Sequence, residues 1–113
     1  MKKLSTEELM DLRRKHGDDG VTIVNVLKDT VFAKEHIPGS VNVPLKADDF
    51  ARRVEKEAGG KEKPIVVHDA DDTCDGSQQA ARTLEDAGFR EVYDYDGGIK
   101  DWREAGHPTE GSR

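Results

Sequence analysis

The chain has 113 residues, and its 24 Asp and Glu against 18 Lys and Arg give a formal net charge of -6. This length predicts one domain, over residues 1–113, with room for a real hydrophobic core. No run approaches the ~20 apolar residues of a membrane span, and no apolar block follows the N-terminal lysines as in a signal peptide. We therefore expect no membrane partner. A single cysteine excludes an internal disulfide, so the expected compartment is the cytoplasm.

Basic residues occur mainly beside carboxylates, as in the run from Arg52 to Glu57. Mixed charge of this kind is typical of a solvated helix face. Nucleic-acid binding depends on phosphate contacts from Lys and Arg, which the acidic excess disfavours. The charge pattern therefore predicts no nucleic-acid partner.

The first half of the chain alternates helical and extended patterns. Ser5 and Glu8 fit a capping box and predict a helix from Thr6 to His16. The apolar, β-branched run 21–27 predicts a strand covered on both faces. Further elements are expected in chain order: a helical turn at 31–35, a short strand at 41–43, and a helix through Phe50, Val54 and Ala58.

The second half repeats this alternation. We expect a buried strand at 64–68, a loop at 69–76, a helix at 78–87 with Ser77 as N-cap, a strand at 92–95, and a final helix lined by Ile99, Trp102 and Ala105. Strands that alternate with helices at these lengths predict an α/β fold with a mostly parallel sheet. Ligands of such sheets bind beyond the carboxyl ends of the strands, where the 69–76 loop lies.

Several motifs then occur in an order that identifies a family. The segment His36-Ile37-Pro38-Gly39-Ser40 is followed by the strand pattern at 65–68, the Gly97-Gly98 turn and Trp102. Together they resemble a rhodanese-like domain, over a core of about residues 4–109. The resemblance implies a three-layer α/β domain, with a five-stranded, mostly parallel sheet flanked by helices.

Active members of this family transfer sulfane sulfur from a donor such as thiosulfate to a thiophilic acceptor, through a cysteine persulfide. For this chain the resemblance implies Cys74 as the nucleophile, with backbone N–H groups of Asp75, Gly76 and Ser77 as substrate-binding donors. The expected partner is a small sulfur donor or a protein thiol or persulfide. No cofactor and no metal are expected.

The loop departs from the family pattern. Asp69 occupies the usual position of the nucleophile, and Cys74 comes five residues later. Gly76 stands where Arg or Lys often precedes the serine. The strand end that typically reads Asp-Val-Arg is Asn25-Val26-Leu27, and Glu35 replaces the glycine before the histidine of the turn.

Four carboxylates lie within seven residues of this loop, and no Lys or Arg lies between Asp69 and Ala81. Neighbouring negative charges disfavour a thiolate and repel thiosulfate. Two hypotheses therefore stay open. One is a sulfurtransferase in which Cys74 uses a neutral, cationic or protein-bound substrate. The other is a catalytically inactive rhodanese-fold module that binds or regulates a basic partner through the acidic loop.

The loop also partly matches two other motifs. Asp69, Asp71 and Thr73 match the Asp-x-Asp-x-Thr nucleophile motif of haloacid-dehalogenase-type phosphatases, but the downstream residues of that motif are missing. A calcium loop starting at Asp71 places Arg82 at its twelfth position, where a glutamate ligand is required. The remaining conspicuous side chains have structural interpretations: His36 in a turn, His68 at a strand end, Trp102 in the core, and Tyr93 and Tyr95 packed on one sheet face.

Overall fold

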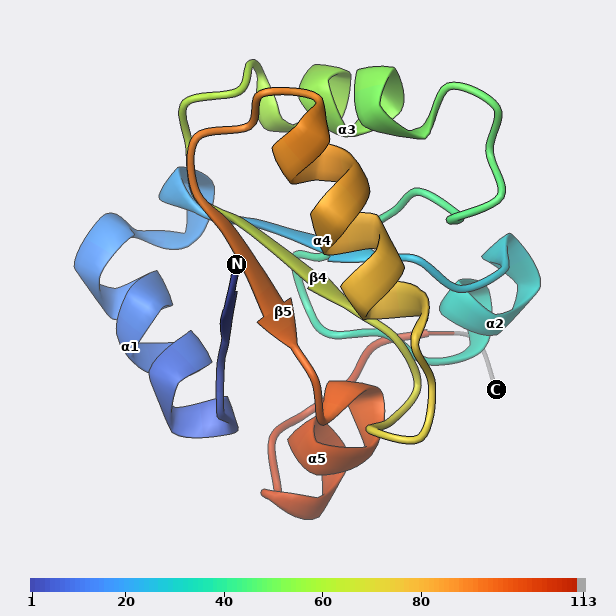
Figure 1. Cartoon of the computed structure of the whole chain (residues 1–113). Helices are drawn as coiled ribbons and strands as arrows, with labels where there is room; N and C mark the ends of the chain where they lie inside the picture. Colours follow the sequence, from blue (N-terminus) through green and yellow to red (C-terminus); the bar gives the residue numbers. More distant parts are fainter. Residues whose placement is uncertain (112–113) are drawn as a thin grey trace.

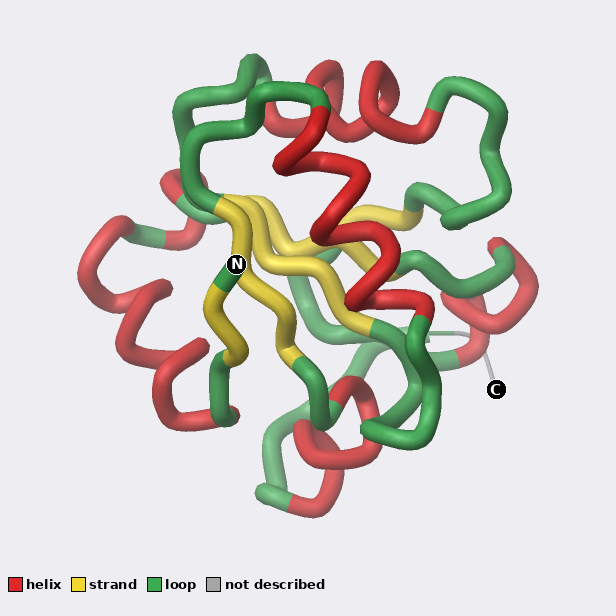
Figure 2. The backbone as a smooth tube through the Cα atoms, in the orientation of Figure 1, coloured by secondary structure: helices red, strands yellow, loops and turns green. Residues whose placement is uncertain are grey.

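The computed structural model describes residues 1–111, in which five parallel strands form one sheet in the spatial order β1-β5-β4-β2-β3. Helices cover both faces of this sheet (Figure 1), which confirms the predicted three-layer α/β architecture (Figure 2). The elements in chain order are β1 (Lys2–Lys3), α1 (Thr6–His16), a 3-10 turn (Asp18–Gly20), β2 (Thr22–Asn25), α2 (Asp29–Lys34), β3 (Val41–Asn42), α3 (Phe50–Ala58), β4 (Ile65–His68), α4 (Gly76–Asp86), β5 (Val92–Tyr95) and α5 (Gly98–Glu104).

The two faces of the sheet bury separate hydrophobic clusters. Successive side chains of a strand point to opposite faces, so Val67 of β4 joins one cluster and Val66 joins the other. The first cluster packs under α3 and α4, with Val54 and Leu84 fully buried. The second packs under α1 and α5 and includes Leu9, Tyr95 and Trp102. No helix within residues 1–111 is long and apolar enough to cross a membrane.

Strand β1 has no signal in the sequence. Both of its lysines are exposed, yet they pair in parallel with Tyr93 and Asp94 of β5. The next residue continues the pairing, since the Leu4 N–H donates to the Asp94 carbonyl at 2.9 Å. Exposed lysines are common on edge strands because they discourage pairing with other chains. β1 is therefore defined by its backbone and not by burial.

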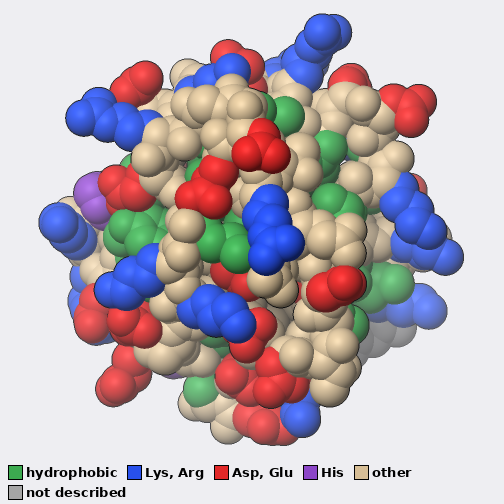
Figure 3. Space-filling model, in the orientation of Figure 1, with side chains coloured by type: hydrophobic (Ala, Val, Ile, Leu, Met, Phe, Trp, Pro, Cys, Tyr) green, Lys and Arg blue, Asp and Glu red, His purple; other side chains and the backbone are tan. Residues whose placement is uncertain are grey.

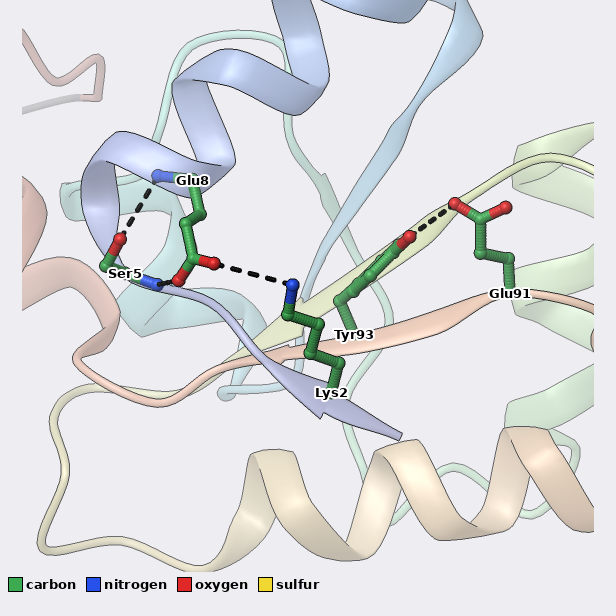
Figure 4. A network of polar contacts seen from close by, with 5 residues as sticks. All are labelled: Lys2, Ser5, Glu8, Glu91 and Tyr93. Atoms are coloured by element: carbon green, nitrogen blue, oxygen red, sulfur yellow. Dashed lines mark hydrogen bonds and ion pairs between the residues drawn. The ribbon is translucent and has the colours of Figure 1, made fainter.

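The capping box predicted for α1 is confirmed (Figure 4). The Ser5 hydroxyl accepts from the Glu8 N–H at 3.1 Å, and the Ser5 N–H donates to Glu8 Oε1 at 2.9 Å. Lys2 of β1 pairs with Glu8 at 3.6 Å, which ties the edge strand to the helix. Beside them the Tyr93 hydroxyl donates to Glu91 at 2.5 Å, and this hydrogen bond raises the pKa of Tyr93 to about 12.

Three local predictions need correction. Helix α2 begins at Asp29 and is longer than the predicted turn at 31–35. Helix α4 begins at Gly76 with Asp75 at the N-cap, so Ser77 is not the cap and lies buried in the first turn. Ala105 is exposed after the end of α5, because Ile99 and Trp102 already complete the buried face of that short helix.

The structural interpretations of the aromatic and histidine side chains are confirmed. His36 Nδ1–H donates to the Phe32 carbonyl at 2.8 Å, and the two rings stack at 3.9 Å. Trp102 is buried, and its indole N–H donates to the Pro108 carbonyl at 2.8 Å. Tyr93 and Tyr95 pack against the same hydrophobic cluster.

Helix α5 rests directly on the backbone of the loop that follows β4. The Ile99 N–H donates to the Asp69 carbonyl at 3.3 Å, and the Lys100 N–H donates to the Ala70 carbonyl at 3.0 Å. Gly98, at φ +61°, allows this approach, because a Cβ there would collide with the Asp69 carbonyl oxygen. Gly98 therefore lets α5 hold the start of the 69–76 loop.

We predict that Gly98→Ala lowers the free energy of unfolding by about 3 kcal/mol, as the sum of left-handed backbone strain and the collision with the loop. Urea unfolding of the purified variant measures this loss. Gly106→Ala is the matched control, since Gly106 also has positive φ but a Cβ there would meet nothing within 4 Å. Its expected loss is about 1 kcal/mol. Equal losses in the two variants would contradict the proposed contact.

Candidate functional site

The candidate site lies where the chain leaves β4 and enters α4, at the carboxyl ends of β4 and β5. In Figure 1 this loop lies beside α5 at the lower end of the molecule. Figure 3 shows Asp and Glu side chains gathered at the same end of that face. The loop carries the thiol and the carboxylates that the sequence singled out, and the ends of two neighbouring strands bring them next to α5.

Asp69 is the first residue after β4, and its side chain points inward. It is 6% exposed, and its Oδ1 accepts from the Ala70 N–H at 2.8 Å. The carboxylate lies against Gly76, the first residue of α4, where a Cβ would collide with Asp69 Oδ2. Glycine at position 76 therefore makes room for the Asp69 carboxylate at the end of the helix.

Cys74 is exposed and lies on a turn organised by Asp71. The Asp71 carboxylate accepts from the Thr73 N–H at 2.9 Å and from its hydroxyl at 2.5 Å. These hydrogen bonds, the hydroxyl's foremost, lower the pKa of Asp71. The Cys74 thiol donates to the same carboxylate at 3.8 Å, and the Cys74 N–H donates to the Asp71 carbonyl at 3.3 Å. The thiol hydrogen bond exists only while the sulfur is protonated.

The charge around Asp71 differs in one respect from the sequence prediction. Although no basic residue lies in the loop, Lys100 of α5 is close enough to contribute to the lowered pKa of Asp71. This cation comes from a segment about thirty residues away in the chain. Within residues 1–111, Asp72 and Asp75 form no ion pair. The loop thus stays predominantly acidic with one cation beside it.

The predicted anion-binding residues Asp75, Gly76 and Ser77 form the N-cap and first turn of α4. Their backbone N–H groups, and that of Gln78, donate to no acceptor within residues 1–111. Four free donors at the positive end of a helix form a typical anion-binding arrangement. The structure thus places these residues next to Cys74 in the chain, with the buried Asp69 carboxylate against Gly76.

Asp94 is a second buried carboxyl at this end of the sheet, and sequence reasoning missed it. It is fully buried on β5, and neither carboxyl oxygen has a hydrogen-bond partner within the described chain. Burial raises its pKa, while the Ser77 hydroxyl comes near enough to lower it without meeting hydrogen-bond geometry. The alternation of side chains along a strand could have indicated this residue, because Asp94 must point to the opposite face of the sheet from Tyr93 and Tyr95.

His68 fixes the start of the loop from the other side of the sheet. It is fully buried, its Nδ1–H donates to the Asp69 carbonyl at 3.0 Å, and its ring packs edge-on against Tyr95 at 6.3 Å. Burial lowers the pKa of His68, which favours the neutral form of the ring. Its Nε2 has no partner among the described residues, so the prediction of a strand-end histidine holds, but only one nitrogen is satisfied.

The carboxylates of the loop do not converge on a metal site. Within residues 1–111, no three His, Cys, Asp or Glu side chains are arranged to hold an ion. Asp69 points inward against Gly76, whereas Asp71 bonds within its own exposed turn. The two aspartates of the phosphatase-like motif therefore face different surroundings.

Comparison with known proteins agrees with these features. The family model for the rhodanese-like domain matches residues 5–105. The thiosulfate sulfurtransferase GlpE of Pseudomonas syringae is 33% identical over 106 residues, which cover 90% of this chain and 87% of GlpE. An HTH-type transcriptional regulator of Mycobacterium tuberculosis is 34% identical over 99 residues, covering 88% of this chain but 41% of that protein.

A solved structure shows the same fold. The solution structure of a rhodanese-like domain from Anabaena superposes with a TM-score of 0.79 at 28% identity, covering 99% of this chain and 80% of that one. The overall fold of this chain is therefore shared with a structure of that description.

The buried carboxyl of Asp94 predicts a pH-dependent stability. Because its pKa is raised above the unfolded value of about 3.9, its contribution to stability is fully present below that value and is lost as pH rises through the raised pKa. Asparagine does not titrate. We therefore expect the unfolding free energy of Asp94→Asn, relative to wild type, to increase as pH rises above about 4.

Urea unfolding at a series of pH values measures this difference. Asp72→Asn is the matched control, because it removes the same charge from an exposed position, and we expect a much weaker pH dependence. If the difference in unfolding free energy between Asp94→Asn and wild type stays constant with pH, burial does not shift the pKa of Asp94.

Proposed function

The chain belongs to the rhodanese-like domain family, and on that premise we propose that it is a sulfurtransferase in which Cys74 carries sulfane sulfur as a persulfide. The observation that carries the proposal is the position of the chain's single cysteine. Cys74 is exposed on the loop between the carboxyl end of β4 and the first turn of α4. A nucleophilic thiol needs access to its substrate and nearby donors that stabilise negative charge.

The reaction is two successive displacements without net oxidation. The Cys74 thiol first gives its proton to solvent, and the thiolate attacks the outer sulfur of the donor. The donor's sulfur–sulfur bond breaks, and its electron pair leaves with the donor thiolate or sulfite. An acceptor thiolate then attacks the outer sulfur of the Cys74 persulfide, which forms the acceptor persulfide and regenerates the Cys74 thiolate.

The surroundings of Cys74 favour particular substrates. Asp71, Asp72 and Asp75 lie within three residues of the sulfur in the chain, and a field of one sign repels ligands of that sign. Thiosulfate carries two negative charges, whereas a low-molecular-weight or protein persulfide carries at most one at the sulfur. We propose that the donor is neutral or presented by a protein, with a basic surface complementary to the loop.

The printed names of the relatives support the reaction class but not the donor. GlpE of Pseudomonas syringae is named a thiosulfate sulfurtransferase. This chain has Asp69 and Gly76 in the corresponding loop where the family typically has cysteine and a basic residue. Sulfur transfer through a persulfide is therefore the part of the activity that we carry over, and preference for thiosulfate is not.

We predict that incubation with a low-molecular-weight organic persulfide, which bears no charged group besides its sulfur, adds the mass of one sulfur atom to the protein at Cys74. The Cys74 thiolate takes the outer sulfur of the donor, and the rest of the donor leaves as a thiolate. Intact-mass and peptide-mass spectrometry measure it, with a thiol added afterwards to remove the sulfur again. Cys74→Ser removes the sole thiol of the chain and should abolish the addition.

Asp72→Asn serves as the control, because it alters the loop while leaving the thiol, and it should still load sulfur. If the wild-type protein gains no sulfur from neutral, anionic or protein-bound donors, the enzymatic proposal is contradicted. The acidic loop would then have to act as a binding surface for a basic partner.

A further inference from the structure

The first turn of α4 has free backbone N–H donors, as an anion-binding site does. Carboxyl groups of the same chain, however, already lie beside these donors. The N–H groups of Asp75, Gly76, Ser77 and Gln78 donate to no acceptor within residues 1–111. The N-cap residue Asp75 makes no side-chain capping bond that would satisfy them. Because α4 is 11 residues long, its dipole adds to the attraction that these donors exert on negative charge.

The Asp69 carboxylate lies at this helix end. It is almost fully buried, and it contacts Gly76 so closely that any side chain at position 76 would displace it. Its backbone is held from both sides, since the His68 ring and the Ile99 N–H both donate to the Asp69 carbonyl. The carboxylate itself is held by burial and by the Ala70 N–H, which donates to its Oδ1 at 2.8 Å.

A second buried carboxyl lies behind the first. Asp94 is fully buried, and its oxygens have no hydrogen-bond partner among the described residues. The hydroxyl of Ser77, in the first turn of α4, is near enough to lower its pKa. None of the ion pairs formed within residues 1–111 involves Asp69 or Asp94. The charge of Lys3 acts on Asp94, but Lys3 forms its ion pair with Asp96. An external anion at this helix end would still have to approach both carboxyl groups.

We infer that Asp69 is a specificity-determining residue, whose buried carboxylate lies against the first turn of α4 and repels anionic sulfur donors from the free N–H groups there. This inference rests on the proposed sulfur transfer for its biological meaning. It narrows the substrate class to donors whose reacting sulfur reaches Cys74 without an oxyanion bound at the α4 amides.

The test is a titration with thiosulfate of ¹⁵N-labelled protein, read from the backbone amide signals of residues 75–78. All proteins carry Cys74→Ser, so that thiosulfate can bind but cannot transfer sulfur. We expect Asp69→Asn, which keeps the shape of the side chain and removes its charge, to bind thiosulfate saturably at these amides. The parent protein should show at least about tenfold weaker binding, equivalent to about 1.4 kcal/mol.

The matched control is Asp72→Asn, which removes one carboxylate from the exposed part of the same loop. We expect it to bind thiosulfate no more than about twofold better than the parent, because a screened surface charge acts weakly. An equal gain in Asp69→Asn and Asp72→Asn would overturn the inference, since total loop charge would then explain the exclusion. Strong binding by the parent protein would overturn it as well.

Folding of each variant is checked by the dispersion of its amide spectrum, and Asp69→Ser replaces Asp69→Asn if the latter does not fold. A folded Asp69 variant without thiosulfate binding at residues 75–78 would also overturn the inference. These outcomes are independent of the sulfur-loading experiment, because no titrated protein contains Cys74. Failure of the proposed reaction and failure of the proposed exclusion are thereby distinguishable.

Discussion

The contact between the Asp69 carboxylate and Gly76 is the constraint on which the chemistry of this loop depends. It is possible because Gly76 has no side chain, and it brings a buried negative charge to the first turn of α4. Helix α5 and His68 hold the backbone of Asp69 by hydrogen bonds to its carbonyl. The rest of the loop then runs outward, which leaves Cys74 exposed and some residues away from the position that the family gives its nucleophile.

In the usual pattern of the family, the residue directly after β4 carries the thiol. In this chain the residue at that position and the residue that carries the thiol are different. The nucleophile position, directly after β4, holds a carboxylate that cannot accept sulfur. The chain's thiol is at Cys74, where Asp71 accepts its hydrogen bond and Lys100 offsets part of the negative charge. The family membership supports the reaction class, and our proposal assigns the choice of donor to the local electrostatics.

Most of the architecture could be predicted from the sequence, because the periodicity of apolar residues and the positions of turn residues indicate where helices and strands lie. The buried strands β2, β4 and β5 and the helices α1 and α3 follow from apolar runs and spacing. β1 could not be found, since two exposed lysines carry no burial pattern and pair only through the backbone. Ser77 has the right residue type for an N-cap, but the tight contact of Gly76 with Asp69 coincides with a helix that begins two residues earlier than predicted.

The site was predicted less completely than the fold. The thiol and the loop carboxylates are visible in the sequence, whereas Lys100 and Asp94 reach the loop from other elements. Lys100 is brought there by the hydrogen bond of its N–H to the Ala70 carbonyl, a contact between residues thirty positions apart. Asp94 is hidden between two tyrosines, and only the alternation of the strand indicates that it faces α4. Long-range contacts of this kind have no local signal.

Negative charge around the accessible Cys74 should select neutral over anionic reagents. Alkylation with iodoacetamide and with iodoacetate measures this selection, because the two reagents react in the same way and differ in charge. The quantity to compare is the rate constant for iodoacetamide divided by that for iodoacetate. At low salt we expect this ratio to be about tenfold higher for Cys74 than for cysteine in an uncharged peptide. Equal ratios in the protein and the peptide would contradict the account.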